Sequence, residues 1–174
     1  MARAIRRFLR FPLAAAAVLA AVPVSAQVTT VLVVRHAEKM TVGGSDPHLS
    51  RAGKLRAEDL AHVAGASGVT AIYATNFLRT QETVAPLAAA LNLTPIVMNA
   101  NLTEQLVEEI QNSRRGQTVL VCGHSDTVPA IVEGLSGVAI EPIPDTRYDG
   151  LYVVTFKDDE SGRATRVRYG KPTP

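Results

Sequence analysis

The sequence predicts an α/β domain of three layers, in which helices cover both faces of a mostly parallel sheet. Short apolar runs of strand length alternate with longer stretches in which apolar residues recur at three- and four-residue steps. Most of the short runs are apolar throughout, as expected for strands covered on both faces. The order strand, helix, strand, helix favours parallel strands joined by right-handed crossovers.

The expected strands are the short apolar runs. The last of them is the weakest prediction, because polar residues interrupt it. In chain order they are Val28–Val34, Val69–Ala74, Thr94–Met98, Thr118–Cys122, Leu151–Phe156 and Ala164–Tyr169.

The first expected helix runs from about Ser50 to Ala64. Ser50 is a residue type that accepts hydrogen bonds from the first free amides of a helix, so we expect it to be the N-cap. The residues expected to face inward are Ala52, Leu55, Leu60, Val63 and Ala64.

Three further helices follow from the same spacing. The second has Arg79 off its apolar stripe, which leaves that side chain free to serve a site. The third is expected to begin with Thr103 as its cap. The apolar stripes are Phe77, Thr80, Val84, Leu87, Ala88 and Leu91 in the second helix, Leu106, Val107 and Ile110 in the third, and Val128, Ile131, Val132 and Leu135 in the fourth.

Residues 1–26 have the pattern of a secretory signal peptide. Arginines precede an apolar run from Phe11 to Val22, and small residues end at Ala26. The run is about twelve residues, whereas a membrane-spanning helix needs about twenty. We therefore expect cleavage after Ala26, no stable membrane anchor afterwards, and a periplasmic or secreted domain comprising residues 27–174.

Charge and cysteine content narrow the function. The formal net charge of the whole chain is +2, and it falls to −2 without residues 1–26, which contain four arginines and no acid. The composition therefore gives no argument for a nucleic-acid partner. Cys122 is the only cysteine, so an intramolecular disulfide is impossible, and its place in an apolar run predicts a small buried side chain.

Polar residues follow three of the expected strands. They are Arg35-His36 after the first, Thr75 to Arg79 after the second, and Gly123-His124-Ser125 after the fourth. Ligands of such sheets bind beyond the carboxyl ends of the strands, so we expect these groups to share one site. The irregular segment Val138 to Asp149, which contains two prolines, is a loop that could border it.

His36 and Arg35 suggest the chemistry of this site. A neutral imidazole can act as base, ligand or nucleophile, and an arginine forks onto phosphate or carboxylate oxygens. His124 also ends a strand, and a helix that starts after it would favour anions. By contrast, His62 lies on the polar side of its helix, and turn chemistry accounts for the surroundings of His48, which we rank low as a site residue.

A zinc site is the alternative for these groups. His36, His124, Glu38 and Asp126 offer the nitrogen and oxygen ligands that zinc accepts. Two arginines aimed at the same pocket would repel a divalent ion, so we expect no metal and no other cofactor.

Three motifs in order resemble the histidine phosphatase superfamily, also called the phosphoglycerate mutase-like family. The segment around Arg35-His36-Ala37-Glu38 is similar to its Arg-His-Gly-Glu motif, with alanine in place of the usual glycine. Ile72 to Thr83 resembles the second signature, and Gly123-His124-Ser125 the third. The segment Asp46 to Gly53 resembles the one that normally follows the first motif. Together they cover most of residues 27–174 and imply a phosphoglycerate mutase-like fold.

The resemblance implies a phosphate pocket made of four side chains. In the family, the first histidine, here His36, attacks phosphorus, and Arg35, Arg79 and His124 hold the equatorial oxygens. Phosphoryl transfer depends chiefly on positioning and on stabilising charge at those oxygens, so fixed cations can replace a metal. The two arginines should also keep His36 neutral by lowering its pKa.

The leaving group needs a proton, and two carboxyl groups are candidates to donate it. Leu102-Thr103-Glu104-Gln105 resembles the family's Leu-x-Glu segment, so Glu104 is the first choice. Asp126 is the alternative, because another branch of the superfamily places its acid directly after the second histidine, and here only Ser125 intervenes.

The expected activity is a histidine acid-phosphatase-like phosphoric monoester hydrolase that acts on a small-molecule phosphoester such as a sugar or envelope-glycolipid phosphate. Mutase activity is not expected, because Val42 stands where mutases usually carry asparagine and the chain lacks long capping insertions. Removal of phosphate from protein phosphohistidine and a non-catalytic phosphate-binding module remain the alternatives.

Overall fold

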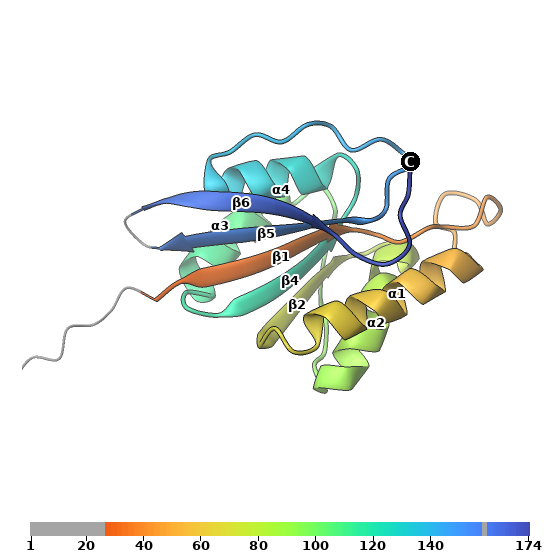
Figure 1. The fold of residues 1–174 in the computed structure, drawn as a ribbon, viewed down its shortest axis with the longest axis horizontal. Helices are drawn as coiled ribbons and strands as arrows, with labels where there is room; N and C mark the ends of the chain where they lie inside the picture. Colours follow the sequence, from red (N-terminus) through yellow and green to blue (C-terminus); the bar gives the residue numbers. More distant parts are fainter. Residues whose placement is uncertain (1–26, 158–159) are drawn as a thin grey trace, which may run out of the picture.

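The computed structural model describes residues 27–157 and 160–174, so the expected signal peptide lies outside the described residues. In that part of the chain the strands form one sheet in the order β3-β2-β4-β1-β5-β6 (Figure 1). They are β1 Thr29–Arg35, β2 Val69–Thr75, β3 Ile96–Met98, β4 Thr118–Gly123, β5 Gly150–Lys157 and β6 Glu160–Arg168.

The strands that precede the expected site are parallel to one another. β3, β2, β4 and β1 pair in parallel, whereas β5 pairs antiparallel with β1 and β6 antiparallel with β5. A parallel arrangement brings the carboxyl ends of β1, β2, β3 and β4 to one edge of the sheet. The predicted mostly parallel sheet is therefore present where it matters for the site, with an antiparallel pair added at one side.

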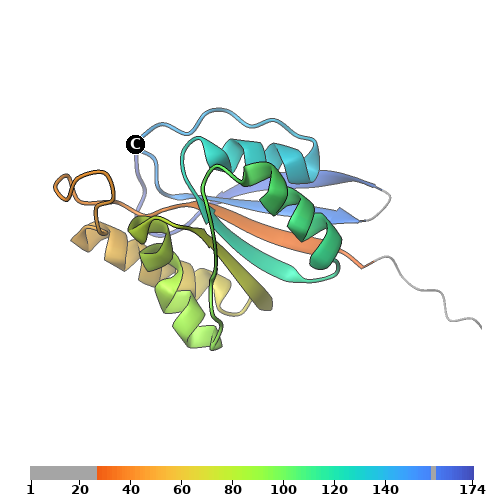
Figure 2. The same cartoon turned by 180° about the vertical axis from the view of Figure 1, so that it is seen from behind.

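The helices cover both faces, which confirms the three-layer prediction (Figures 1 and 2). Alternate residues of β1 serve two cores: Leu32 and Val34 belong to the cluster that includes residues of α1 and α2, and Val31 and Val33 to the cluster that includes residues of α3 and α4. The helices are α1 Arg51–Ala64, α2 Leu78–Leu91, α3 Thr103–Ser113 and α4 Thr127–Ser136.

The predicted inward face of α1 is confirmed at Leu60 and Ala64, which are buried, and wrong at Ala52, Leu55 and Val63, which are exposed. Leu55 and Val63 are 54% and 45% exposed. The helix instead turns Arg56 inward, where it meets Glu38, and packs closely at Gly53, where an added Cβ would lie 2.1 Å from the carbonyl oxygen of Glu38. A specific ion pair and a close backbone approach therefore outweighed the burial of two apolar side chains.

The helix starts were predicted with mixed success. Ser50 caps α1, because its side chain accepts from the amide of Gly53. Thr103 does not cap α3, since the N-cap is Leu102 and the Thr103 hydroxyl donates to the carbonyl of Ala100. The apolar stripes of α3 and α4 are buried as predicted, and in α2 only the end members, Phe77 and Leu91, are partly buried.

Two loops lie beside the carboxyl ends of β1, β2 and β4. Residues 40–48 form a projecting loop closed at its base by the bridge between Lys39 and Leu49 (Figure 1). The irregular segment 138–149 returns to the same end and meets the C-terminal residues. Among the described residues, no helix combines the length and apolarity needed to span a bilayer.

Candidate active site

A surface cavity of about 550 Å³ lies beyond the carboxyl ends of β1, β2 and β4. Each of the three polar groups that follow these strands contributes to it, because the parallel arrangement carries them to the same edge. Its lining residues are Arg35, His36, Lys39, Phe77, Arg79, Ala100, His124, Ser125, Asp126, Asp145 and Tyr148.

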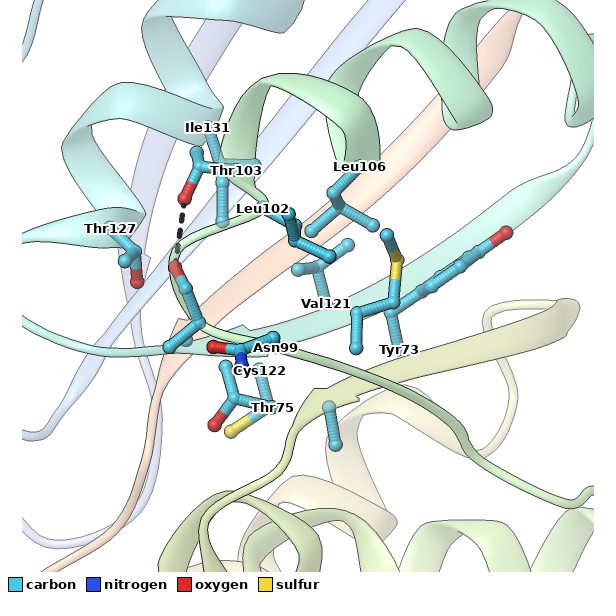
Figure 3. Close-up of a pocket in the computed structure, with 14 residues that line it drawn as sticks. Tyr73, Thr75, Asn99, Leu102, Thr103, Leu106, Val121, Cys122, Thr127 and Ile131 are labelled. Carbon is cyan, nitrogen blue, oxygen red and sulfur yellow. Dashed lines mark hydrogen bonds between the residues drawn. The ribbon is translucent and has the colours of Figure 1, made fainter.

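A second, much smaller cavity lies on the α3 and α4 side of the sheet (Figure 3). It holds about 20 Å³ and is lined by side chains that include Thr75, Leu106, Val121 and Ile131. A space of that size accommodates about one water molecule and no phosphoester. The cavity beyond the strand ends, where the three polar groups meet, is therefore the candidate active site.

His36 is buried immediately after β1. Its backbone amide donates to Gly123 of the neighbouring strand, and Nδ1 lies 2.8 Å from the carbonyl oxygen of Ala37. Because a carbonyl oxygen only accepts, Nδ1 carries the proton and Nε2 keeps its lone pair. Burial lowers the pKa of His36 to about 3, and the charges of Arg35, His124 and Arg79 act in the same direction, outweighing the opposing Ala37 bond. The imidazole is therefore neutral at neutral pH.

His124 is held between an arginine and a threonine. Its Nδ1 lies 3.4 Å from Nη2 of Arg79, and its Nε2 lies 2.9 Å from the hydroxyl of Thr75. A guanidinium only donates, so Nδ1 accepts and Nε2–H donates to Thr75. Burial and then the charge of Arg79 lower the pKa of His124 to about 4, although Asp126 opposes this. The ring centroids of His36 and His124 are 5.4 Å apart.

Arg79 enters the cavity from the first turn of α2. Asp46, from the loop at 40–48, accepts from Nη1 of Arg79 at 3.4 Å and from the backbone amide of Leu78 at 3.0 Å. Phe77, the N-cap residue, provides no side-chain hydrogen bond. Asp46 therefore both completes the start of the helix and positions the arginine.

Arg35 ties the cavity to the loop at 138–149. Its Nη1 donates to the carbonyls of Pro144 at 2.8 Å and Arg147 at 3.1 Å, and its Nη2 lies 3.5 Å from Asp145. Burial lowers the pKa of Arg35, and only Tyr148 and the carboxylates oppose this effect.

Both arginines have a donor left over. The Nε–H groups of Arg35 and Arg79 are buried and have no hydrogen-bond partner among the residues that the structure describes. A buried unsatisfied donor is costly. Both guanidinium groups line the cavity beside two neutral histidines, so the cavity is suited to an anion.

The structure separates the two candidate acids. Glu104 is exposed and lines a different groove, between α3 and α4, so the structure does not bring it to the cavity with His36. The reason is that α3 starts beyond β3 and turns this side chain toward α4. Asp126 lines the cavity at the start of α4, and Asp145, which the sequence analysis did not single out, lines it from the loop.

Other candidate residues have structural partners outside the cavity. His48 pairs with Glu82, which also accepts from the amide of Leu49 and so attaches the projecting loop to α2. Glu38 pairs with Arg56, and His62 is exposed as predicted. Within 27–157 and 160–174, no three histidine, cysteine, aspartate or glutamate side chains are grouped as metal ligands.

The sequence analysis missed several residues that contribute to the cavity. Lys39 and Tyr148 line it, and Asp46 positions Arg79. Asp46 follows a glycine pair in a segment typical of a turn, so no local signal marked it as a helix cap for residues far along the chain. Tyr148 lies in a loop whose path depends on Arg35, which only the folded chain reveals.

Known structures share this fold. The protein histidine phosphatase SixA in complex with tungstate is 20% identical, with a TM-score of 0.65 over 80% of this chain and 96% of that one. SixA from Agrobacterium tumefaciens, described as a putative phosphohistidine phosphatase, is 21% identical, with a TM-score of 0.61 over 82% and 98%. A mycobacterial glucosyl-3-phosphoglycerate phosphatase is 14% identical, with a TM-score of 0.66 over 82% and 99%.

The sequence also matches a family directly. Residues 31–107 fit the family model described as histidine phosphatase superfamily (branch 1), and this range contains the first two motifs. The match begins in β1 and ends in α3, so it includes Arg35, His36 and Arg79. Residues 31–107 of this chain are therefore similar to the histidine phosphatase superfamily (branch 1), and the solved structures share the fold.

Proposed function

We propose that this protein hydrolyses phosphomonoesters through a phosphohistidine formed on His36. The observation that carries the proposal is the hydrogen bond from Nδ1 of His36 to the carbonyl of Ala37, which leaves Nε2 as a neutral nucleophile beside two arginines. Nε2 attacks phosphorus, the bond from phosphorus to the leaving oxygen breaks, and a water molecule later cleaves the phosphorus–nitrogen bond to release phosphate.

Arg35, Arg79 and His124 stabilise the charge of the transferring group. The hydrogen bonds of Arg35 to Pro144 and of Arg79 to Asp46 hold both guanidinium groups before substrate binds, so little reorganisation is needed when charge moves onto the equatorial oxygens. His124 accepts from Nη2 of Arg79 through Nδ1 and donates to Thr75 through Nε2, so it positions Arg79 at the cavity.

Asp126 is the proposed proton donor. It lines the cavity next to His124, whereas Glu104 does not. In the first step its carboxyl group protonates the leaving oxygen, and in the second its carboxylate takes a proton from the attacking water. A missing acid is felt most by poor leaving groups, so Asp126→Asn should slow alkyl phosphates far more than nitrophenyl phosphate, and Glu104→Gln should slow neither.

The first test replaces the nucleophile. His36→Ala should reduce turnover of nitrophenyl phosphate on the order of a thousandfold or more, because the covalent intermediate cannot form. Intact-mass measurement on rapidly quenched, unacidified wild-type protein should detect a single added phosphoryl group, absent from the variant. Hydrolysis retained by the variant would refute the proposal.

The natural substrate and the compartment belong to the same proposal. Export of residues 27–174 favours a sugar, envelope-glycolipid or other extracytoplasmic phosphoester. Protein phosphohistidine is the competing substrate, and it enters through the resemblance in fold to the SixA proteins. A panel of phosphoesters that includes a phosphohistidine peptide, together with localisation of the full chain in cells, tests these points.

A further inference from the structure

Four rings form a continuous series across the candidate active site. Phe77 lies 5.2 Å from His124 between ring centroids, His124 lies 5.4 Å from His36, and His36 lies 6.0 Å from Tyr148. The two histidines occupy the middle, so the benzene rings of Phe77 and Tyr148 are the outer members. Both outer rings line the cavity.

Each outer ring also contacts one of the two arginines. The guanidinium carbon of Arg79 lies 4.2 Å from the ring centroid of Phe77, and that of Arg35 lies 4.4 Å from the ring of Tyr148. A cation over an aromatic face is favourable. These contacts hold the rings beside the groups that would bind the phosphoryl oxygens.

The main chains of the two aromatic residues are also held. The carbonyl of Phe77 accepts from the amide of Thr80 at 3.2 Å in the first turn of α2. The amide of Tyr148 donates to the hydroxyl of Thr173 at 3.0 Å. Because both rings are held before a ligand arrives, contact with them costs little conformational entropy.

We propose that Phe77 and Tyr148 make this pocket selective for phosphoesters whose leaving group is a flat aryl ring. This inference rests on the proposed function, because it places the phosphoryl group between the histidines, and it narrows the substrate to phosphoesters other than sugar phosphates, whose rings are saturated. A leaving group opposite His36 then extends into the part of the cavity that the two rings border. Flat rings make offset or edge contacts with such rings, which a saturated ring cannot reproduce.

The test measures binding without chemistry. Phosphonates lack the scissile oxygen bond, so titration calorimetry reports affinity alone. Phenylphosphonate and cyclohexylphosphonate have rings of similar size that differ in flatness, provided that the pH is high enough for both to be dianions, and methylphosphonate reports the phosphoryl subsite. We expect the wild-type protein to bind phenylphosphonate about fivefold more tightly than cyclohexylphosphonate. Equal affinities would overturn the inference.

Variants identify the rings responsible. Phe77→Leu and Tyr148→Leu keep an apolar side chain but remove the ring, so each should reduce the phenyl-to-cyclohexyl affinity ratio toward one. Tyr148→Phe is the matched control, because it keeps the ring and should keep the ratio. If both leucine variants fold and retain the wild-type ratio, the assignment of Phe77 and Tyr148 is wrong.

The outcome is separable from that of the proposed function. Turnover and phosphorylation of His36 with equal affinity for the two ring phosphonates would refute only the selectivity. Absence of both turnover and binding of methylphosphonate would refute the proposed function and the selectivity together. The affinity ratio in the wild-type protein decides the inference even if a variant fails to fold.

Discussion

Arg35 and Arg56 are both buried, but they lie in two different regions of the molecule. Arg35 ends β1 and lines the candidate active site, whereas Arg56 lies in α1 and pairs with Glu38. Both are nearly inaccessible, at 5% and 3% exposed. All three nitrogens of Arg56 donate, to Glu38 and to the carbonyls of Tyr169 and Lys171. Arg35 donates through Nη1 and weakly through Nη2, and its Nε has no partner among the described residues.

The pKa values of Arg35 and Arg56 are shifted in opposite directions. Burial alone would lower both pKa values, but the hydrogen bonds and charge of Glu38 outweigh it and raise the pKa of Arg56. At Arg35 burial prevails and lowers the pKa, because its carboxylate neighbour Asp145 is 93% exposed. Arg56 is paired with a partly buried carboxylate inside the fold, whereas Arg35 lines the candidate active site and its carboxylate neighbour is exposed.

The largest effect is expected when Arg35, in the candidate active site, is replaced. Arg35→Lys keeps the positive charge but loses the planar set of donors, so the second-order rate constant kcat/KM for nitrophenyl phosphate should fall on the order of a thousandfold. Steady-state kinetics on the folded variant measures this. A loss smaller than about tenfold would mean that Arg35 serves the loop at 138–149 more than the substrate.

The next largest effect is expected when Arg56 is replaced, which should lower stability. Arg56→Met leaves Glu38 partly buried without its cation, so the free energy of unfolding should fall by about 3 kcal/mol, with activity per folded molecule largely kept. Urea titration followed by circular dichroism measures it. The double variant Glu38→Gln/Arg56→Met should recover part of the loss, because it removes the uncompensated charge. No recovery would show that the tail contacts of Arg56 matter more than the pair.

A third experiment measures how the free energy of unfolding depends on pH through the two histidines of the candidate active site. The pKa values of His36 and His124 are lowered to about 3 and about 4 in the fold, whereas an unfolded histidine titrates near about 6.5. Unfolding therefore takes up protons below that pH, and the stability present above it is lost as pH falls toward 4, by about 1.4 kcal/mol per pH unit for each histidine.

Variants assign that pH dependence. His124→Asn should flatten the dependence of the unfolding free energy on pH between about 6.5 and 4 by one proton. His62→Asn changes an exposed histidine and is the control, with no expected change in slope. If His124→Asn has the wild-type slope, His124 is not neutral at pH 5 in the folded protein.

The smallest expected effect tests the link between the two regions. The hydroxyl of Thr173 accepts from the amides of Tyr148 and Asp149, and the same C-terminal segment is attached to Arg56 through Lys171. Thr173→Val should lower the free energy of unfolding by about 1 kcal/mol and raise KM about twofold, because the Tyr148 backbone loses an anchor. Thr173→Ser should behave as wild type. An unchanged KM in Thr173→Val would mean that the C-terminal segment does not influence substrate binding.

Much of the fold and the centre of the candidate site could be predicted from local patterns. Unbroken apolar runs located the strands because a strand buried on both faces has no polar side. Arg35, His36, Arg79 and His124 could be found because they follow strands, and parallel strands bring their ends together. These are consequences of short-range sequence spacing, which needs no knowledge of partners.

Only the tertiary structure decided the residues whose role depends on a distant partner. Arg56 of α1 faces inward because it meets Glu38, which apolar spacing does not indicate, and Glu104 was directed away from the cavity by the packing of α3 against α4. Asp46 caps a helix 32 residues further along the chain, and Tyr148 meets Arg35 across the sheet edge. Sequence periodicity reports which residues avoid water, but ion pairs and ring contacts depend on distances that arise only when the chain has folded.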